Sequence, residues 1–328
     1  MRGVLFAAVL LGSTAGLADE PFWREVVDPD LRTFREEIAT GRSLLPDSED
    51  EGDLGKLVRM GEALAHFDRA VAIRPDDPVG HLLRARALRE LAESPVLRTK
   101  NREAIAALRR ARELDRDREF EEDVAFDLGI ALTVEGDFDG ALAEYDRGLA
   151  LCVSPDSRSI NLSNAAEVLM NRGRVREAIE RYEAAIAEAR LDGIRSLAEY
   201  GLAVALDRDD QRGRALEVMR DGWNHDPNRA DPNRLCGTLT NPGDSGVFFV
   251  PAHDHHYYVA LQLEARAAVE ADEAIRQRLA ETSANEWQEF LSSGGAAGPW
   301  ARQAREHAAA IDHRRVGRPR RGTGRRGR

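Results

Sequence analysis

Residues 126–148, FDLGIALTVEGDFDGALAEYDRG, contain the pattern that decides the fold. The apolar and small residues that stand here at helical spacing are Leu128, Gly129, Leu132, Ala141, Tyr145 and Gly148. Gly136, in the middle of the stretch, marks a turn between the two halves. Residues four apart share one face of a helix, and small residues on that face let a neighbouring helix approach closely. The stretch therefore predicts two helices joined by a turn.

The second half of this pattern recurs every 37 residues. Each copy has a bulky apolar residue at +4 and a small one at +7, and the copies open at Ala104, Ala141, Ala178 and Ala215. An earlier copy opens at Ala63, 41 residues before Ala104. The first half recurs at Ala165-Ala166 and Leu202-Ala203, and the turns between halves fall at Gly136, Gly173 and Asp209-Asp210. Pro75 and Pro227 follow the second helix, where a residue without an N–H ends it.

These phased copies resemble the tetratricopeptide repeat family, with the match covering roughly residues 30–227 and continuing in degraded form to about 311. The period is about three residues longer than the usual 34, which an extra helical turn or a longer loop absorbs. The resemblance implies an all-α fold, a right-handed α-α superhelix of five to six hairpins plus a capping helix. Because repeats add units to one continuous core, a single elongated body is expected.

The expected organisation follows from the phasing. It consists of a signal peptide at 1–18 and a solenoid at 19–227, with repeats at about 30–77, 78–118, 122–155, 159–192 and 196–229. An irregular loop at 228–252, a degenerate terminal repeat with a capping helix at 253–313, and a basic tail rich in Arg and Gly at 314–328, expected to be disordered, follow the solenoid. The loop ends in the apolar run 247–250, which is predicted to tuck onto the solenoid.

The N-terminus indicates export. Arg2 precedes an apolar run, and Gly16-Leu17-Ala18 supplies the small residues that a signal peptidase requires before Asp19. The run of about fifteen residues is shorter than the roughly 20 that span a bilayer, although an uncleaved anchor is the alternative. No cysteine follows the cut, so no lipid attachment is expected there. The mature protein is expected in a bacterial periplasm or outside the cell.

Two cysteines, Cys152 and Cys236, would lie in an oxidising compartment. They stand two repeats apart, and stacked hairpins separate such positions by more than the Cα distance of about 7 Å that a disulfide allows. Both are interpreted as packing or loop residues. A bond between them would require the loop that carries Cys236 to fold back.

The family resemblance implies a partner-binding inner face lined by the first helices. The residues carried over to it are Arg86, Arg89, Phe126, Ile130, Thr133, Ser163, Glu167, Met170, Tyr200, Val204 and Asp207. The asparagine column of the family's carboxylate-clamp subtype reads Ile130, Glu167 and Val204 here, so binding of a chaperone's terminal peptide is not expected. Phe126 and Tyr200 are the predicted anchors for an apolar helix or extended segment of another protein.

His253-Asp254-His255-His256 is the best candidate for chemistry, because imidazoles and a carboxylate can ligate a divalent metal. The preferred interpretation is that Asp254 caps a helix beginning near His255. The chain has no phosphate-binding loop, no dinucleotide fingerprint and no convincing pair of nucleophile and base. We therefore expect no enzyme, no cofactor and no resident metal.

The tail from Arg314 to Arg328 has eight arginines and no acid. Of the 47 basic residues, these eight and Arg2 lie outside the body, which leaves 38 against 58 acids, a formal charge of −20. Such a tail suits an anionic lipid, an envelope polymer or an acidic partner, and nucleic acid is not expected in an exported protein. The sequence leaves three hypotheses: a protein-binding scaffold, which is preferred, an electrostatic tether through the tail, and a metal-dependent role at His253.

Overall fold

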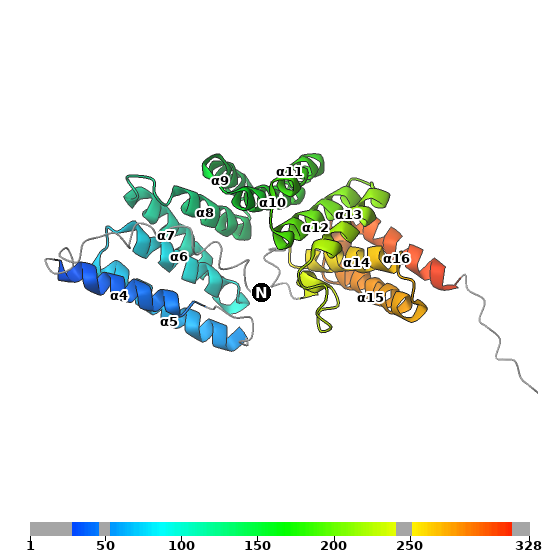
Figure 1. The fold of residues 1–328 in the computed structure, drawn as a ribbon, viewed down its shortest axis with the longest axis horizontal. Coiled ribbons are helices and arrows are strands. Elements are labelled where there is room, and N and C mark those ends of the chain that lie inside the picture. Colours follow the sequence, from blue (N-terminus) through cyan, green and yellow to red (C-terminus); the bar gives the residue numbers. More distant parts are fainter. Residues whose placement is uncertain (1–27, 46–52, 241–250, 317–328) are drawn as a thin grey trace, which may run out of the picture. The chain divides into compact units, whose positions relative to one another are not determined.

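The computed structural model describes residues 28–45, 53–240 and 251–316. All regular structure in these ranges is helical, with thirteen α-helices and no strand (Figure 1). The all-α prediction is thereby confirmed. None of the helices in the described ranges combines the length and the apolar character needed to cross a bilayer. The leader 1–18, the run 247–250 and tail residues 317–328 lie outside those ranges.

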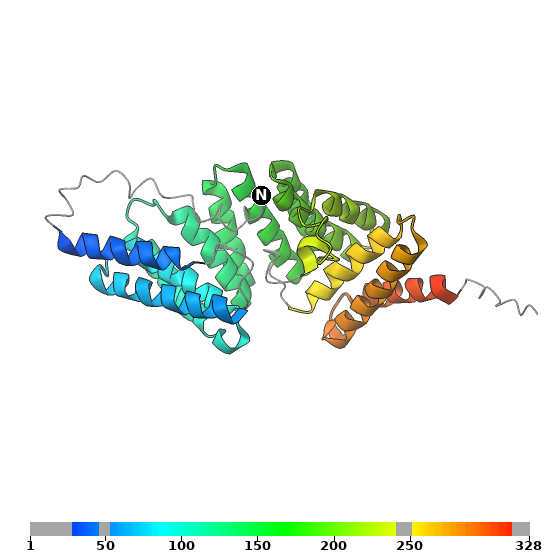
Figure 2. The same cartoon turned by 60° about the horizontal axis from the view of Figure 1, so that its bottom comes forward.

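The chain divides into two compact units, the first formed by residues 1–172 and 187–190, and the second by 173–186 and 191–328. The helices of unit 1 are α4 (Pro29–Ser43), α5 (Asp53–Ile73), α6 (Pro78–Ala92), α7 (Lys100–Leu114), α8 (Glu121–Glu135), α9 (Phe138–Leu151) and α10 (Pro155–Asn171). Consecutive helices pack as the hairpins α4–α5, α6–α7 and α8–α9, which Figure 2 shows from a second side. The unit thus consists of three helical pairs, with α10 packed on α9.

Unit 2 repeats this arrangement. Its helices are α11 (Val175–Glu188), α12 (Asp192–Arg208), α13 (Arg212–His225), α14 (Asp254–Ala267), α15 (Glu273–Ser292) and α16 (Ala301–Val316). The pairs α12–α13 and α14–α15 form hairpins, and α16 packs on α15. The division into units falls inside the expected repeat 159–192, whereas the sequence places its one interruption at 228–252. The superhelix and the single elongated body therefore remain predictions.

The predicted turns have the backbone that their residues favour. Gly136 and Gly173 have φ of 80° and 73°, and Asp210 takes the same left-handed region with φ of 61°. Glycine adopts this region without steric cost, and aspartate tolerates it better than most residues do. Gly136 follows α8, Gly173 follows α10 and Asp210 follows α12, so the structure confirms the three turns that the sequence predicts.

Capping residues set where the helices begin. Asp77 accepts a hydrogen bond from the Val79 N–H at 3.0 Å before α6, and Asp137 accepts one from Gly140 N–H at 3.1 Å before α9. Pro78 and Pro155 occupy the first position of their helices, where no N–H is needed. These capping aspartates and initial prolines can all be recognised from the sequence alone.

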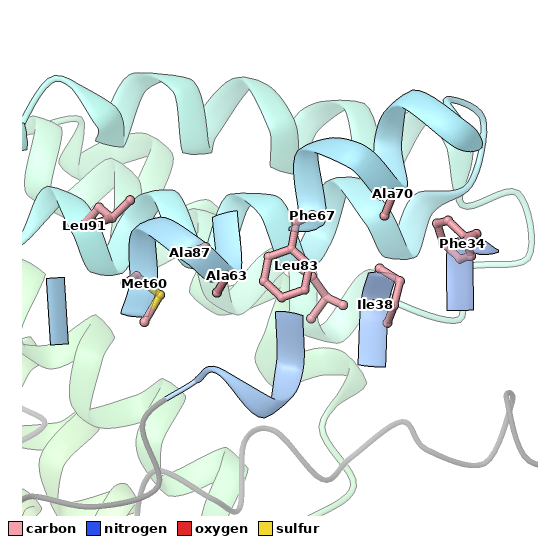
Figure 3. Close-up of a cluster of buried hydrophobic side chains, with 9 residues drawn as sticks. All are labelled: Phe34, Ile38, Met60, Ala63, Phe67, Ala70, Leu83, Ala87 and Leu91. Atoms are coloured by element: carbon pink, nitrogen blue, oxygen red, sulfur yellow. The ribbon is translucent and has the colours of Figure 1, made fainter. Parts of the chain in front are cut away.

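The repeated alanines lie at the centre of the packing. Ala63, Ala104, Ala141, Ala178 and Ala215 have no exposed surface. In the first two hairpins the core cluster consists of Phe34, Ile38, Met60, Ala63, Phe67, Ala70, Leu83, Ala87 and Leu91, drawn in Figure 3. These side chains come from α4, α5 and α6, so the first helix of the second hairpin closes the core of the first pair. Burial of this kind is the main stabilising contribution in a repeat array.

The end of unit 2 differs from the sequence prediction in two places. Asp254 is expected to cap α14, but His253 stands at the cap without a side-chain bond, and Asp254 lies in the first turn. Its carboxylate pairs instead with the buried guanidinium of Arg208, at 3.0 Å between Oδ2 and Nη2. The basic tail is expected to begin at Arg314, yet α16 continues to Val316.

Candidate functional site

The eleven residues predicted to bind a partner lie on α6, α8, α10 and α12. Arg86 and Arg89 are on α6, Phe126, Ile130 and Thr133 on α8, Ser163, Glu167 and Met170 on α10, and Tyr200, Val204 and Asp207 on α12. Five are half-buried: Arg86, Arg89, Phe126, Ile130 and Ser163. Six are buried: Thr133, Glu167, Met170, Tyr200, Val204 and Asp207. The structure thus separates an accessible subset from an inaccessible one.

Tyr200 is not a surface anchor, and this part of the prediction is wrong. Its side chain has no exposed area, and its hydroxyl donates to Asp226 Oδ2 at 2.8 Å while accepting from Gln262 Nε2 at 3.0 Å. Its ring packs so close to Gly222 that a Cβ there would lie 2.8 Å from two ring carbons. Tyr200 therefore belongs to the core where α12, α13 and α14 meet.

Val204 and Asp207 are also buried in the core, because the elements that follow α12 in the chain cover it. Val204 has no exposed surface, and Asp207 accepts a hydrogen bond from Tyr257 of α14. The repeat phasing places both residues on an inner face but contains no information about what covers that face. The signal in the sequence is the irregular loop that begins at residue 228, which is predicted to tuck onto the solenoid.

The accessible subset lies in unit 1, where α8 contacts both α6 and α10. Phe126 and Ile130 stand one turn apart on α8, and both are half-buried. Thr133, one turn further along, is buried, with its hydroxyl donating to the Gly129 carbonyl at 2.8 Å. We call the set Arg86, Arg89, Phe126, Ile130 and Ser163 the α6–α8–α10 surface.

Arg86 is held by two carboxylates of the next first helix. Its Nε donates to Asp127 Oδ2 and its Nη2 to Asp123 Oδ1, both at 2.6 Å. Burial alone lowers the pKa of Arg86, but the two carboxylates outweigh it and raise the pKa above its ordinary value. Arg86 is therefore a fixed cation whose hydrogen-bonding groups face its own protein. Asp123 stands 37 residues after Arg86, one repeat period, so the phasing alone could have identified this pair.

Arg89 is also engaged inside the protein. Its Nη2 donates to Glu90 Oε1 at 2.8 Å, and its Nε lies 3.7 Å from Asp127 Oδ1. Burial lowers the pKa of Arg89, but Glu90 and Asp127 outweigh burial, so the pKa lies above its ordinary value. The α6–α8–α10 surface therefore presents an apolar pair, Phe126 and Ile130, beside charges that already satisfy one another.

The residues of the His253 cluster diverge to separate protein partners. The ring of His253 lies edge-on to Phe290 with centroids 5.4 Å apart, His255 Nε2 donates to the Leu239 carbonyl at 2.8 Å, and His256 Nδ1 lies 2.7 Å from Glu286 Oε2. Across the described ranges, no group of three or more His, Cys, Asp or Glu side chains converges in a way that could hold a metal ion. The geometry gives a metal-dependent role at His253 no support.

Cys152 and Cys236 are both buried free thiols. Burial raises the pKa of each to about 12, so neither forms the reactive thiolate at neutral pH. Cys152 Sγ accepts a hydrogen bond from Asn161 Nδ2 at 3.3 Å, a packing role of the kind the sequence indicates.

Comparison with known proteins gives similarities of fold only. No protein-family model and no curated protein matches the chain. Among solved structures, it is similar to YrrB, described as a TPR protein with an unusual peptide-binding site, at 16% identity and a TM-score of 0.43, over 63% of this chain and 93% of that one. It is similar to MamA at 16% identity and a TM-score of 0.43, over 61% of this chain and 96% of that one. It is also similar to the APC/C hetero-tetramer Cut9–Hcn1, at 14% identity and a TM-score of 0.46, over 88% of this chain and 50% of that one. With TM-scores below 0.5, these similarities support no inference about what this chain binds.

Proposed function

We propose that this protein is a non-enzymatic scaffold or adaptor of the cell envelope that binds a partner protein through the α6–α8–α10 surface. The observation that carries the proposal is the half-buried apolar pair Phe126 and Ile130, standing beside arginines whose charges are already paired. A surface with satisfied charges gains little from a charged ligand, whereas partly exposed apolar side chains gain from being covered.

The expected partner is an apolar helix face or an extended segment that presents aliphatic or aromatic side chains to Phe126 and Ile130. Buried aromatic residues near the centre of an interface contribute most of its affinity, and paired charges at the rim contribute specificity. The side chains of Arg86 and Asp123 are only 12% and 23% exposed, so this ion pair would contribute little area to such a rim.

The envelope location belongs to the same proposal and rests on the leader sequence at residues 1–18. Export predicts that protein purified from its native source begins at Asp19. The intact mass of that protein distinguishes a cleaved chain from one that retains the leader.

The test of binding is a double substitution, Phe126→Ala with Ile130→Ala. We expect the partner captured from an envelope extract by the wild-type chain to bind this variant at least about tenfold more weakly, because truncating a central aromatic residue costs upwards of about 1.4 kcal/mol. Affinity is measured with the purified partner by calorimetry. A photo-crosslinking residue placed at position 163 should label that partner directly.

The matched control is Val96→Ala with Val153→Ala, two residues of unit 1 that are 89% and 91% exposed. This pair removes exposed apolar surface outside the proposed site and should leave the affinity unchanged. Thermal unfolding checks that both double variants remain folded. Equal affinities for the two variants would remove the α6–α8–α10 surface from the proposal.

A second candidate function, a tether to an anionic envelope polymer or membrane, is favoured by the segregation of charge between the acidic body and the tail. Deleting residues 317–328 removes six arginines and leaves α16 intact. We expect co-sedimentation with anionic lipid vesicles at low salt to be lost on deletion, and to be lost by the wild type at about 0.5 M salt. A chain with the six arginines changed to glutamine keeps the length as a control. Unchanged sedimentation of both variants would end this candidate.

A further inference from the structure

His307 of α16 lies between two carboxylates in the interior of unit 2, with its side chain only 2% exposed. Its Nε2 is 2.9 Å from Asp207 Oδ1 on α12, and its Nδ1 is 2.6 Å from Glu264 Oε2 on α14. A carboxylate only accepts hydrogen bonds, so both ring nitrogens donate, and an imidazole that donates from both nitrogens is the protonated cation. The geometry describes an imidazolium ion clamped by two first helices.

The groups that face this imidazolium come from every neighbouring helix. Tyr257 of α14 donates to Asp207 Oδ2 at 2.5 Å, and Arg212 of α13 donates to Glu264 Oε1 at 2.5 Å. Trp287 of α15 stacks on the imidazole, with ring centroids 4.6 Å apart and planes inclined by 16°. The two cations, His307 and Arg212, balance the two anions, Asp207 and Glu264.

The remaining charges near the cluster are already paired. Arg208 of α12 lies over the rings of Tyr257 and Trp300 and is paired with Asp254. Arg302 of α16 pairs with Asp210 at 2.6 Å, where both side chains are more than half exposed. Loss of the proton from His307 therefore leaves two buried carboxylates facing one arginine, Arg212.

α16 makes only a small apolar contact, so the ion cluster around His307 contributes a larger share of the free energy that holds this helix in place. Over residues 301–311, the part of α16 whose side chains are described, the buried apolar residues are Ala301, Ala304, Ala308 and Ile311. Three of the four are alanine, whose burial contributes little because each removes only a methyl group from water. The exposed Arg302 pair adds little either, since pairs of that kind contribute at most about 1 kcal/mol.

We propose that His307 is a pH-sensitive clasp, which holds α16 against α12, α14 and α15 while it is protonated and releases the helix when it loses its proton. Release uncovers Asp207, Glu264 and Trp287, a face that the chain itself covers in the docked state. The device is independent of the α6–α8–α10 surface, which lies in the other unit.

The direction of the pH dependence follows from the contacts. Burial lowers the pKa of His307, but the hydrogen bonds that it donates to Asp207 and Glu264 outweigh burial and raise the pKa above its ordinary value. The stabilisation is therefore fully present below about pH 6.5, the pKa of an unfolded histidine, and is lost as pH rises through the higher folded pKa. Tyr257 has a pKa well above its ordinary value and Cys236 one of about 12, so neither titrates first.

Hydrogen exchange of the full-length chain between pH 6 and pH 10, corrected for intrinsic rates, tests the clasp. We expect the protection of peptides from α16 to fall at least about tenfold over this range, relative to peptides from α5 in the other unit. In His307→Gln, α16 should exchange quickly at every pH. In His307→Arg, which carries a permanent cation, protection should persist to high pH.

The control is His256→Gln, which removes a half-buried histidine of unit 2 that contacts Glu286 rather than α16. It should leave the pH dependence of α16 unchanged. The proposal is overturned if the wild-type protection of α16 is flat from pH 6 to pH 10, or if His307→Gln retains the wild-type profile. The wild-type series and an NMR titration of the His307 ring decide the matter even if a variant does not fold.

Discussion

Replacing Asp226 with alanine is expected to destabilise unit 2 by roughly 2–4 kcal/mol, because several buried donors lose their acceptor together. Asp226 has no exposed surface. Its Oδ2 accepts from Tyr200 Oη at 2.8 Å and from Thr238 N at 2.9 Å, and its Oδ1 accepts from Asn228 N and Thr238 Oγ1, both at 2.8 Å. This one carboxylate ties the loop after α13 to the core of α12.

The measurement is chemical unfolding of Asp226→Ala followed by tryptophan fluorescence, which reports unit 2 through Trp223, Trp287 and Trp300. Asp226→Asn keeps one acceptor oxygen and should lose an intermediate amount. Asp231→Ala is the matched control, since Asp231 caps an exposed turn in the same loop by accepting from Asn233 N at 2.9 Å. A loss for Asp226→Ala no larger than the loss for Asp231→Ala would contradict the network.

Substitutions at Gly129 are expected to have the second large effect, because α8 and α9 touch at this residue. A Cβ at Gly129 would lie 2.5, 2.7 and 2.8 Å from three ring carbons of Tyr145, which has almost no exposed surface itself. Overpacking of a core typically costs about 1–3 kcal/mol, and the gain in helix propensity from alanine offsets only about 0.5–1. We expect Gly129→Ala to lose about 1–2 kcal/mol, and Gly129→Leu to lose more than about 3.

Gly61→Ala is the control, since Gly61 lies within α5 and a Cβ there meets no atom within 4 Å. The same substitution should stabilise by up to about 1 kcal/mol at Gly61. Urea unfolding of both variants gives the two free energies. If the clash is the cause, combining Gly129→Ala with Tyr145→Ala should cost less than the sum of the two single changes. If the losses in unfolding free energy of the two single variants simply add in the double variant, the clash is not the cause.

Much of unit 1 could be predicted from the sequence because its determinants are local and periodic. Spacing alone predicts that Gly136 lies in a turn and that Ala141 lies on a buried helix face, and φ of 80° and full burial confirm both predictions. Arg86 and Asp123 occupy equivalent positions in neighbouring repeats, since one period separates them, and this predicts that they lie on neighbouring first helices. Contacts between adjacent repeats recur at fixed sequence separations, so the pattern contains them.

The candidate site was predicted less well, and α12 explains why. Phe126 and Tyr200 occupy equivalent columns two periods apart, yet Phe126 is half-buried and Tyr200 has no exposed surface. The difference comes from the segment after α13, where Asp226 and Thr238 hold the loop against Tyr200. The position of a residue within the repeat predicts which face of its helix it occupies. It does not predict which non-repeating segment packs on that face.

The sequence by itself determined the helices, their turns, the phase of the repeats and the alanine-lined core, because these follow from helical periodicity, capping and steric freedom within one repeat. Only the tertiary structure decided which first helices stay accessible. It also decided that His307 reaches Asp207 across 100 residues and that Asp254 pairs with Arg208 instead of capping α14. Those contacts join segments that share no repeat, so no spacing in the chain specifies them, and they form only when the helices pack.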